Sequence, residues 1–65
     1  MQINQIVRVN MGRQSIRGKV WGFSESGDIF IKVFPQYQDL AKEPGLEYDE
    51  DSHILKIKKD NPCLQ

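Results

Sequence analysis

Residues 15–34 read SIRGKVWGFSESGDIFIKVF, and the prediction of the fold starts from their pattern. Apolar and polar side chains alternate through 15–23 and again through 28–34, which is the period of a β-strand. The connection between the two runs, residues 24–27, contains Gly27. A short glycine-containing connection between two alternating runs predicts a β-hairpin. We therefore expect the second and third strands of the protein here.

The predicted hairpin has an aliphatic face and a face that mixes aromatic rings with cations. On the mixed face we expect four cross-strand pairs: Phe23 with Asp28, Trp21 with Phe30, Lys19 with Lys32, and Arg17 with Phe34. On the other face we expect three: Gly22 with Ile29, Val20 with Ile31, and Gly18 with Val33. This second face carries no charge and is the expected core face, formed by Ile16, Val20, Ile29, Ile31 and Val33. Its two glycines let a strand bend or another backbone approach.

A further strand is predicted on each side of the hairpin. Residues 3–10 alternate and are followed by a turn in which Gly12 is free to adopt a positive φ. Residues 53–59 alternate again, and their aliphatic face consists of Leu55 and Ile57. These two runs raise the expected number of strands to four or five, depending on what the acidic stretch before residue 53 forms.

The segment between the third strand and the strand at 53–59 is long. Pro35 ends the third strand because proline cannot donate a hydrogen bond to a sheet. Residues 36–42 are expected to form one or two helical turns, and Pro44-Gly45 ends this segment. The acidic residues 47–52 that follow are expected to form a loop or a hairpin.

The length of the chain allows one domain. It has 65 residues, and single domains begin at roughly 50 residues. We assign residues 1–60 to one β domain and expect 61–65 to be a frayed tail. A single sheet of this size cannot cover its own apolar face, so we expect it to curl on itself. The predicted fold class is all-β: a small, partly open barrel of four to five antiparallel strands with one short helical turn.

Three segments of the chain resemble the SH3-like small barrels of the KOW and Tudor kind. They are Val7-Arg8-Val9, residues 17–22 and residues 28–33. The resemblance covers about half the chain and implies an SH3-like topology. The long segment after Pro35 departs from the short loops of that family.

A second resemblance involves the later part of the chain. Residues 29–35, the helical stretch, residues 45–48 and residues 54–57 resemble the strand–proline–helix–strand pattern of swapped-hairpin antitoxins and transition-state regulators. That resemblance implies a dimeric DNA-binding protein. The first two dozen residues have no counterpart in the pattern.

The charges are balanced in number but separated along the chain. Nine basic and nine acidic residues give a formal net charge of zero. Residues 1–34 carry five basic and two acidic side chains, whereas 35–65 carry four basic and seven acidic ones. The acidic side chains concentrate in one predicted loop, at Glu47, Asp49, Glu50 and Asp51. Such an asymmetry is a hint of a polar partner.

The residue content argues against catalysis and against a metal or cofactor. His53 is expected on an edge strand and Cys63 in the tail, so nothing favours a Cys–His pair. The acidic residues lack the spacing of a calcium-binding EF-hand loop, and the glycines form no phosphate-binding loop before a helix. A chain this short also has little room for a small-molecule pocket. We therefore expect no enzyme activity, no metal, no cofactor and no small-molecule substrate.

The sequence contains no signal for export or membrane insertion. Met1 is followed by Gln2 and Ile3 without a basic segment or an apolar run, so no signal peptide is expected. No uncharged stretch approaches the ~20 residues of a membrane span. We expect a cytoplasmic protein without a membrane partner, and a lone cysteine fits a reducing compartment.

The mixed face of the hairpin is the candidate binding site. The residues concerned are Arg13, Arg17, Lys19, Trp21, Phe30, Lys32 and Phe34. The four cations would contact phosphates, and Trp21 and Phe30 would stack on bases or wedge between them. The first function hypothesis is therefore a non-catalytic module, regulatory in role, that associates with nucleic acid.

Two alternatives involve proteins. Trp, Phe and Arg also dominate protein interfaces, so the same face, or the acidic loop, would suit an accessory subunit or a small inhibitor or regulator. A homodimer interface is a further alternative, since the core is thin. For the rings themselves we expect residues 35–52 to cover Trp21, Phe30 and Phe34, because a bare aromatic patch would be unusually large for a monomer.

Overall fold

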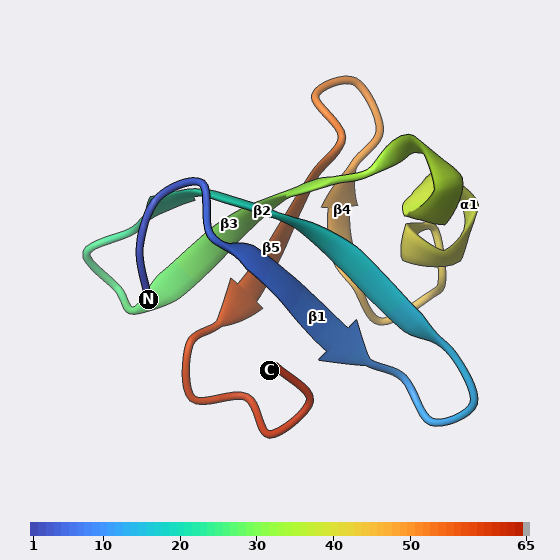
Figure 1. Ribbon diagram of the computed structural model, residues 1–65, viewed down its shortest axis with the longest axis horizontal. Coiled ribbons are helices and arrows are strands. Elements are labelled where there is room, and N and C mark those ends of the chain that lie inside the picture. The colour runs from blue at the N-terminus through green and yellow to red at the C-terminus, as the bar shows by residue number, and fades with distance from the viewer. Residues whose placement is uncertain (65) are drawn as a thin grey trace.

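One curved antiparallel sheet dominates the computed structural model, which describes residues 1–64 (Figure 1). Within these residues the strands are β1 (Ile6–Asn10), β2 (Ser15–Phe23), β3 (Asp28–Val33), β4 (Glu47–Asp49) and β5 (Ile54–Lys58). A 3₁₀ turn, η1 (Pro35–Tyr37), leads into one short helix, α1 (Gln38–Ala41), between β3 and β4. The predicted all-β fold with one short helix is confirmed.

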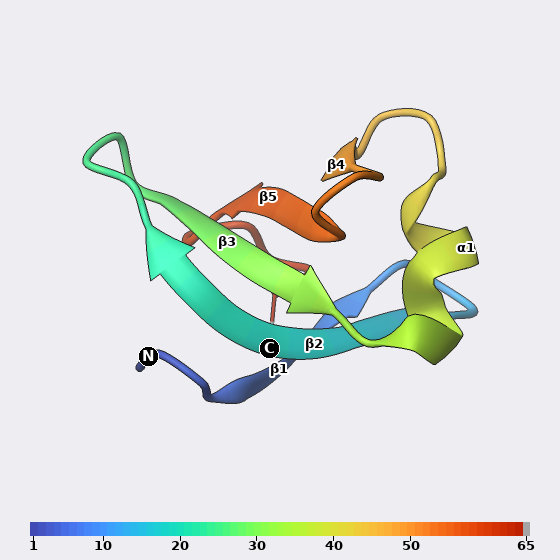
Figure 2. The ribbon, with the colours of Figure 1, turned by 90° about the horizontal axis from the view of Figure 1, so that it is seen from above.

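The order of the strands differs from their order in the chain. The sheet runs β1-β2-β3-β5-β4, and Figure 2 shows it from above. All neighbours are antiparallel. The chain leaves β3 through α1, forms β4 at the sheet edge, and returns as β5 between β3 and β4. Because β1 does not pair with β4 within residues 1–64, the barrel is partly open, as predicted. The resemblance to SH3-like barrels stays a prediction.

The concave side of the sheet holds the core. The predicted core residues Ile16, Val20, Ile29, Ile31 and Val33 are all buried, as are Leu55 and Ile57. Val7 and Val9 of β1 and Ala41 of α1 complete the buried cluster. Partly buried side chains, including Tyr37 and Leu40, pack against it. The alternation of apolar residues therefore identified the core face correctly, because the pleat sends every second side chain to the same side.

A β-bulge changes the predicted register of the hairpin. The pairs Gly18–Val33, Lys19–Lys32 and Val20–Ile31 are confirmed, but beyond them Gly22 pairs with Phe30 and Phe23 with Ile29. The expected pairs Trp21–Phe30, Gly22–Ile29 and Phe23–Asp28 are therefore wrong. The bulge inserts one extra residue into β2, so that two residues oppose Phe30 and the parity reverses after Val20. Gly22 consequently leaves the core face and Phe23 joins it at the exposed end of the strand.

Both ends of the domain differ from the prediction. Strand β1 begins at Ile6 rather than at residue 3, because residues 2–5 form a turn in which Asn4 has φ +69°. The described part of the expected frayed tail, residues 61–64, returns to β1 instead. The Asn10 N–H donates to the Cys63 carbonyl at 2.7 Å, and Leu64 pairs with Val9. These contacts occupy part of the otherwise open edge of β1; Gln65 lies outside the described residues.

The turn between β2 and β3 is held by the buried carboxylate of Asp28. Its Oδ2 accepts hydrogen bonds from the hydroxyls of Ser24 (3.3 Å) and Ser26 (3.1 Å). Lys56 Nζ lies 3.6 Å from Oδ2, and Lys58 Nζ lies 4.0 Å from Oδ1. Burial alone would raise the pKa of Asp28, but the Ser26 hydroxyl, the two ammonium groups and Ser24 outweigh it and lower the pKa below its ordinary 3.8.

This lowered pKa predicts how stability depends on pH. A carboxylate whose pKa is lower in the folded state contributes stability above its unfolded pKa, and that stability is lost as the pH falls through the folded pKa. We expect Asp28→Asn to lower the urea midpoint at neutral pH, and the difference from wild type to shrink well below pH 3.8. Asp60→Asn, at an exposed position, is the control and should leave the midpoint unchanged. A difference for Asp28→Asn that is independent of pH would contradict the prediction.

Candidate nucleic-acid interface

Trp21 is an exposed aromatic side chain on the convex side of the sheet. It is the one tryptophan of the chain, and 61% of its surface is exposed. The bulge places it at the bend of β2, and its ring meets Phe30 edge-to-face with centroids 6.4 Å apart. The expectation that residues 35–52 cover Trp21 is wrong. Ala41 of α1 is buried in the core, and β4 joins the sheet beyond β5, so neither element lies over this ring.

Two grooves lie beside Trp21. The first, which we name the loop groove, has a volume of about 790 Å³ and lies between the outer face of the hairpin and the β4–β5 loop. The second, the N-terminal groove, has a volume of about 610 Å³ and lies between residues 3–4, the bend of β2 and the end of β3. Trp21, Lys32 and His53 line both grooves. Phe30 lines the loop groove and Phe34 the N-terminal groove, and both rings are half-buried.

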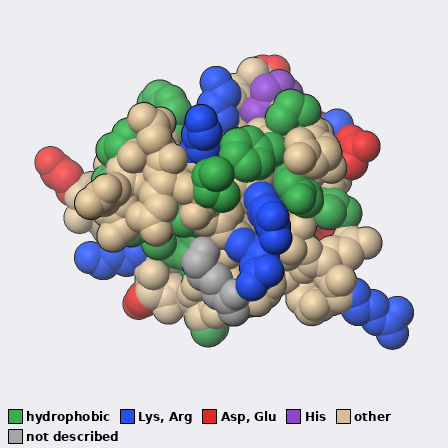
Figure 3. Space-filling view, in the orientation of Figure 1, with side chains coloured by type: hydrophobic (Ala, Val, Ile, Leu, Met, Phe, Trp, Pro, Cys, Tyr) green, Lys and Arg blue, Asp and Glu red, His purple; other side chains and the backbone are tan. Residues whose placement is uncertain are grey.

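Three cations of the hairpin, Arg17, Lys19 and Lys32, are exposed and have no ionic partner among residues 1–64. Lys19 lies directly opposite Lys32, as predicted, and Arg17 lies opposite Arg8 of β1. Among residues 1–64, no carboxylate is within ion-pair distance of Arg17, Lys19 or Lys32. Figure 3 shows basic side chains beside hydrophobic ones in the middle of one face of the molecule, with acidic side chains mostly at its margin.

Arg13 stands apart from the other candidate residues. It lies in the turn between β1 and β2, whereas Trp21 is near the opposite end of β2. Six residue steps of β2, from Ser15 to Trp21, lie between that turn and the ring, a length of at most about 20 Å at 3.3 Å per residue. The structure therefore brings Lys19, Trp21, Phe30, Lys32 and Phe34 together around the two grooves, continues to Arg17 along β2, and leaves Arg13 outside.

Three acidic side chains of the second half of the chain, Asp39, Glu47 and Glu50, pair with lysines of the same half. Glu47 lies 3.7 Å from Lys56, whose Nζ also approaches Asp28. Glu50 faces the other way and lies 3.4 Å from Lys42. Of the predicted acidic loop, Glu47, Asp49 and Asp51 line the loop groove, whereas Glu50 does not. The acidic half of the sequence therefore does not neutralise the lysines of the hairpin through ion pairs.

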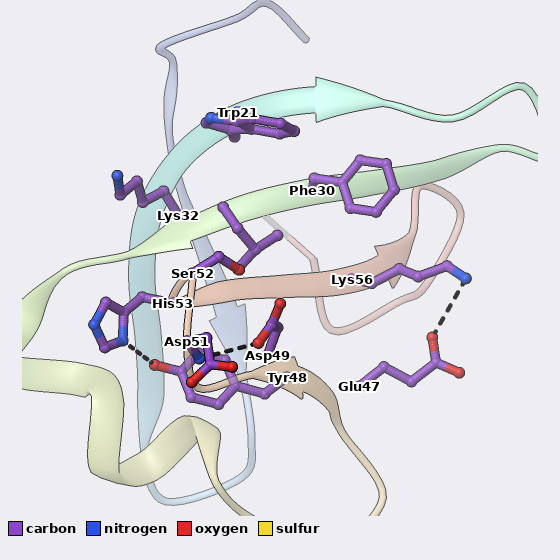
Figure 4. Close-up of a pocket in the computed structure, with 11 residues that line it drawn as sticks. Trp21, Phe30, Lys32, Glu47, Tyr48, Asp49, Asp51, Ser52, His53 and Lys56 are labelled. Atoms are coloured by element: carbon purple, nitrogen blue, oxygen red, sulfur yellow. Dashed lines mark hydrogen bonds and ion pairs between the residues drawn. The ribbon is translucent and has the colours of Figure 1, made fainter.

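The β4–β5 loop has a defined shape (Figure 4). Asp49 Oδ1 accepts the Asp51 N–H at 3.0 Å, and this hydrogen bond, with that of the Ser52 hydroxyl, lowers the pKa of Asp49. The Tyr48 hydroxyl lies 3.0 Å from His53 Nδ1, and burial raises the pKa of Tyr48. His53 itself has φ +61°, and its carbonyl accepts the Val33 N–H at 2.9 Å. The loop is thereby attached to the end of β3 beside both grooves.

Several groove residues were not singled out from the sequence. Lys56 and Tyr48 reach the loop groove because β5 pairs with β3 and β4 with β5. Asn4 and Gln38 reach the N-terminal groove from a turn and a helix. The parity of Lys56, opposite to Leu55, does indicate an outward position. No local pattern indicates which strands pair or where the N-terminal turn lies.

The arrangement offers stacking surfaces, positive charge and side-chain amides. Within residues 1–64, no group of three or more His, Cys, Asp and Glu side chains is placed to hold a metal ion. The same residues contain no helix with the length and apolar character needed to cross a bilayer. Comparison with protein-family models, curated proteins and solved structures finds no match to this chain.

Proposed function

We propose that this domain is a non-catalytic module that binds single-stranded nucleic acid through Lys19, Trp21 and Lys32. The observation that carries the proposal is the exposed ring of Trp21 beside the cross-strand pair Lys19–Lys32, neither of which has an ionic partner among the described residues. A base stacked on an aromatic ring contributes about 1–3 kcal/mol, and lysines that contact phosphates release counterions. A regulatory role in the cytoplasm is part of this proposal.

The repulsion between Lys19 and Lys32 supports the same function. Like charges directly opposite each other in a sheet are unfavourable, and neither lysine has a carboxylate within ion-pair distance among residues 1–64. A phosphate bound between the two ammonium groups would remove this repulsion. The free protein thus carries an electrostatic cost that a polyanion would relieve.

The architecture of the sheet also favours nucleic acid. Five antiparallel strands form a partly open barrel, the general architecture of the OB-fold. OB-folds are five-stranded, partly open Greek-key barrels that bind oligonucleotides on the face of strands 2 and 3 and at the loop between strands 4 and 5. In this chain Trp21 and Phe30 lie on β2 and β3, the strands that correspond to that face.

The test uses the fluorescence of the single tryptophan. Titration with oligothymidylate of about twelve nucleotides should quench the emission of Trp21, because the base stacks on its ring. The association constant should fall steeply as salt rises, with a slope of about −0.7 for each phosphate contact. Two to three contacts would therefore give a slope of about −1.4 to −2.

The control is a duplex of the same length at each salt concentration. The duplex should bind more weakly, because its paired bases are not free to stack on Trp21. An affinity for oligothymidylate that does not change between low and moderate salt would contradict the proposal. So would the absence of any quenching at low salt.

A second candidate function is recognition of a protein, and a different observation supports it. Ile6, Phe23 and Ile3 expose about half or more of their surface, and the loop groove carries three carboxylates that would suit a basic partner. The domain would then act as an accessory subunit, a small inhibitor or a homodimer. A stoichiometric protein that stays bound after nuclease treatment, or a dimer in sedimentation equilibrium, would favour this function.

A further inference from the structure

We propose that the sugar–phosphate backbone of the bound strand lies in the N-terminal groove, with a base against Trp21, and does not enter the loop groove. This inference rests on the proposed function and adds a path for the ligand. The two grooves meet at Trp21 and Lys32, so a strand that stacks on Trp21 has both available. Their charges decide between them.

The N-terminal groove is complementary to a polyanion. Lys19 and Lys32 line it, and none of its lining residues carries a carboxylate. Val33, Phe34 and Pro35 form part of its apolar lining, together with Trp21. A nucleotide seated there would meet an aromatic surface on one side and two ammonium groups, without any anionic neighbour in the groove.

The loop groove has the opposite character. Glu47, Asp49 and Asp51 line it, and its own lysine, Lys56, already pairs with Glu47 and Asp28. The hydrogen bonds that Asp49 accepts favour its ionised form. A phosphate placed in this groove would face several carboxylates, and Lys32 is the one lining lysine that lacks an ionic partner among residues 1–64. Repulsion between like charges therefore excludes the sugar–phosphate backbone from the loop groove.

Two amide side chains complete the N-terminal groove. Asn4 approaches from the N-terminal turn and Gln38 from the start of α1. The Asn4 N–H donates to the Val20 carbonyl at 2.8 Å and the Val20 N–H donates to the Gln5 carbonyl at 2.9 Å, so the turn is fixed against β2. Neither amide group has a hydrogen bond within the described residues. Amides donate and accept, as recognition of a base edge requires.

The experiment introduces a carboxylate into one groove and removes one from the other. Asn4→Asp and Gln38→Glu change an amide to a carboxylate of nearly equal size, and aspartate tolerates the positive φ of Asn4. Asp51→Asn removes a charge from the loop groove at a side chain without an ion pair among residues 1–64. Affinity for oligothymidylate is measured at low salt by fluorescence, and thermal unfolding checks that each variant is folded.

We expect Asn4→Asp and Gln38→Glu each to weaken binding about tenfold, and Asp51→Asn to change it by less than about twofold. Strengthening by Asp51→Asn with no effect of the other two would place the backbone in the loop groove and overturn the inference. Equal effects of all three, or no effect of any, would overturn it as well. Failure of the wild-type protein to bind would instead contradict the proposed function, so the two failures are distinguishable.

Discussion

Replacing Lys19 by glutamate is expected to weaken binding of oligothymidylate about a hundredfold at low salt, while making the protein slightly more stable. Binding falls because a phosphate contact is lost and a repulsive charge takes its place beside Trp21. Stability rises because the like-charged pair Lys19–Lys32 becomes an oppositely charged one, which is worth about 0.2–1 kcal/mol across a sheet. If Lys19 had a purely structural role, its replacement would not weaken binding of oligothymidylate while stabilising the folded protein.

The measurements are a fluorescence titration at several salt concentrations and a urea unfolding curve. Lys59→Glu is the matched control, since it makes the same charge change at an exposed position that lines neither groove. It should change the affinity by less than about twofold. If Lys19→Glu and Lys59→Glu weakened binding equally, the hairpin face would not be the binding site.

Replacing Gly18 by alanine is expected to destabilise the domain by about 1–3 kcal/mol, the usual result of overfilling a packed core. Gly18 is buried, and a methyl group there would collide with the Lys32 carbonyl oxygen and lie 2.7 Å from Ile31 Cγ2. The first of these neighbours is backbone and cannot rotate away. A domain of 65 residues has a total stability of about 3–10 kcal/mol, so the loss is a large part of it.

Gly22→Ala is the control for Gly18→Ala. It makes the same chemical change on the same strand, and its Cβ would have Phe30 Cδ2 at 3.9 Å as its nearest neighbour, an ordinary contact. Thermal unfolding should show a melting temperature lower by about 4–8 °C per kcal/mol for Gly18→Ala, and little change for Gly22→Ala. Equal melting temperatures for the two variants would show that β2 and β3 are less closely packed at Gly18 than described.

Much of the fold was predictable because its main signals are local. The alternation in residues 15–23 and 28–33 identified two strands and the core face, since the pleat assigns faces by parity alone. Gly12, with φ +81°, marked a turn, and Pro35 ended a strand, through their own backbone preferences. The opposition of Lys19 and Lys32 was predicted from a pairing of Phe23 with Asp28 that the structure does not contain. It holds because the bulge offsets the one-residue difference at the turn.

The candidate site was predicted only in part. Lys19, Trp21, Phe30, Lys32 and Phe34 do gather on one region, but Arg13 lies away from it. The exposure of Trp21 was predicted wrongly, because it depends on where residues 35–52 pack rather than on the hairpin itself. The N-terminal groove was not anticipated, since its amides come from elements distant from each other along the chain.

The local pattern of residues 15–34 was enough to predict an antiparallel hairpin with an aliphatic face, and the aliphatic side chains that this face buries. The tertiary structure placed β5 between β3 and β4 and returned Leu64 to Val9. It also introduced a bulge that moves Gly22 away from the core face. Strand alternation is a property of neighbouring residues, whereas pairing and curvature depend on how distant segments share one small core. For the same reason, a net charge of zero did not predict that folding would produce one groove lined by carboxylates and another lined by lysines without carboxylates.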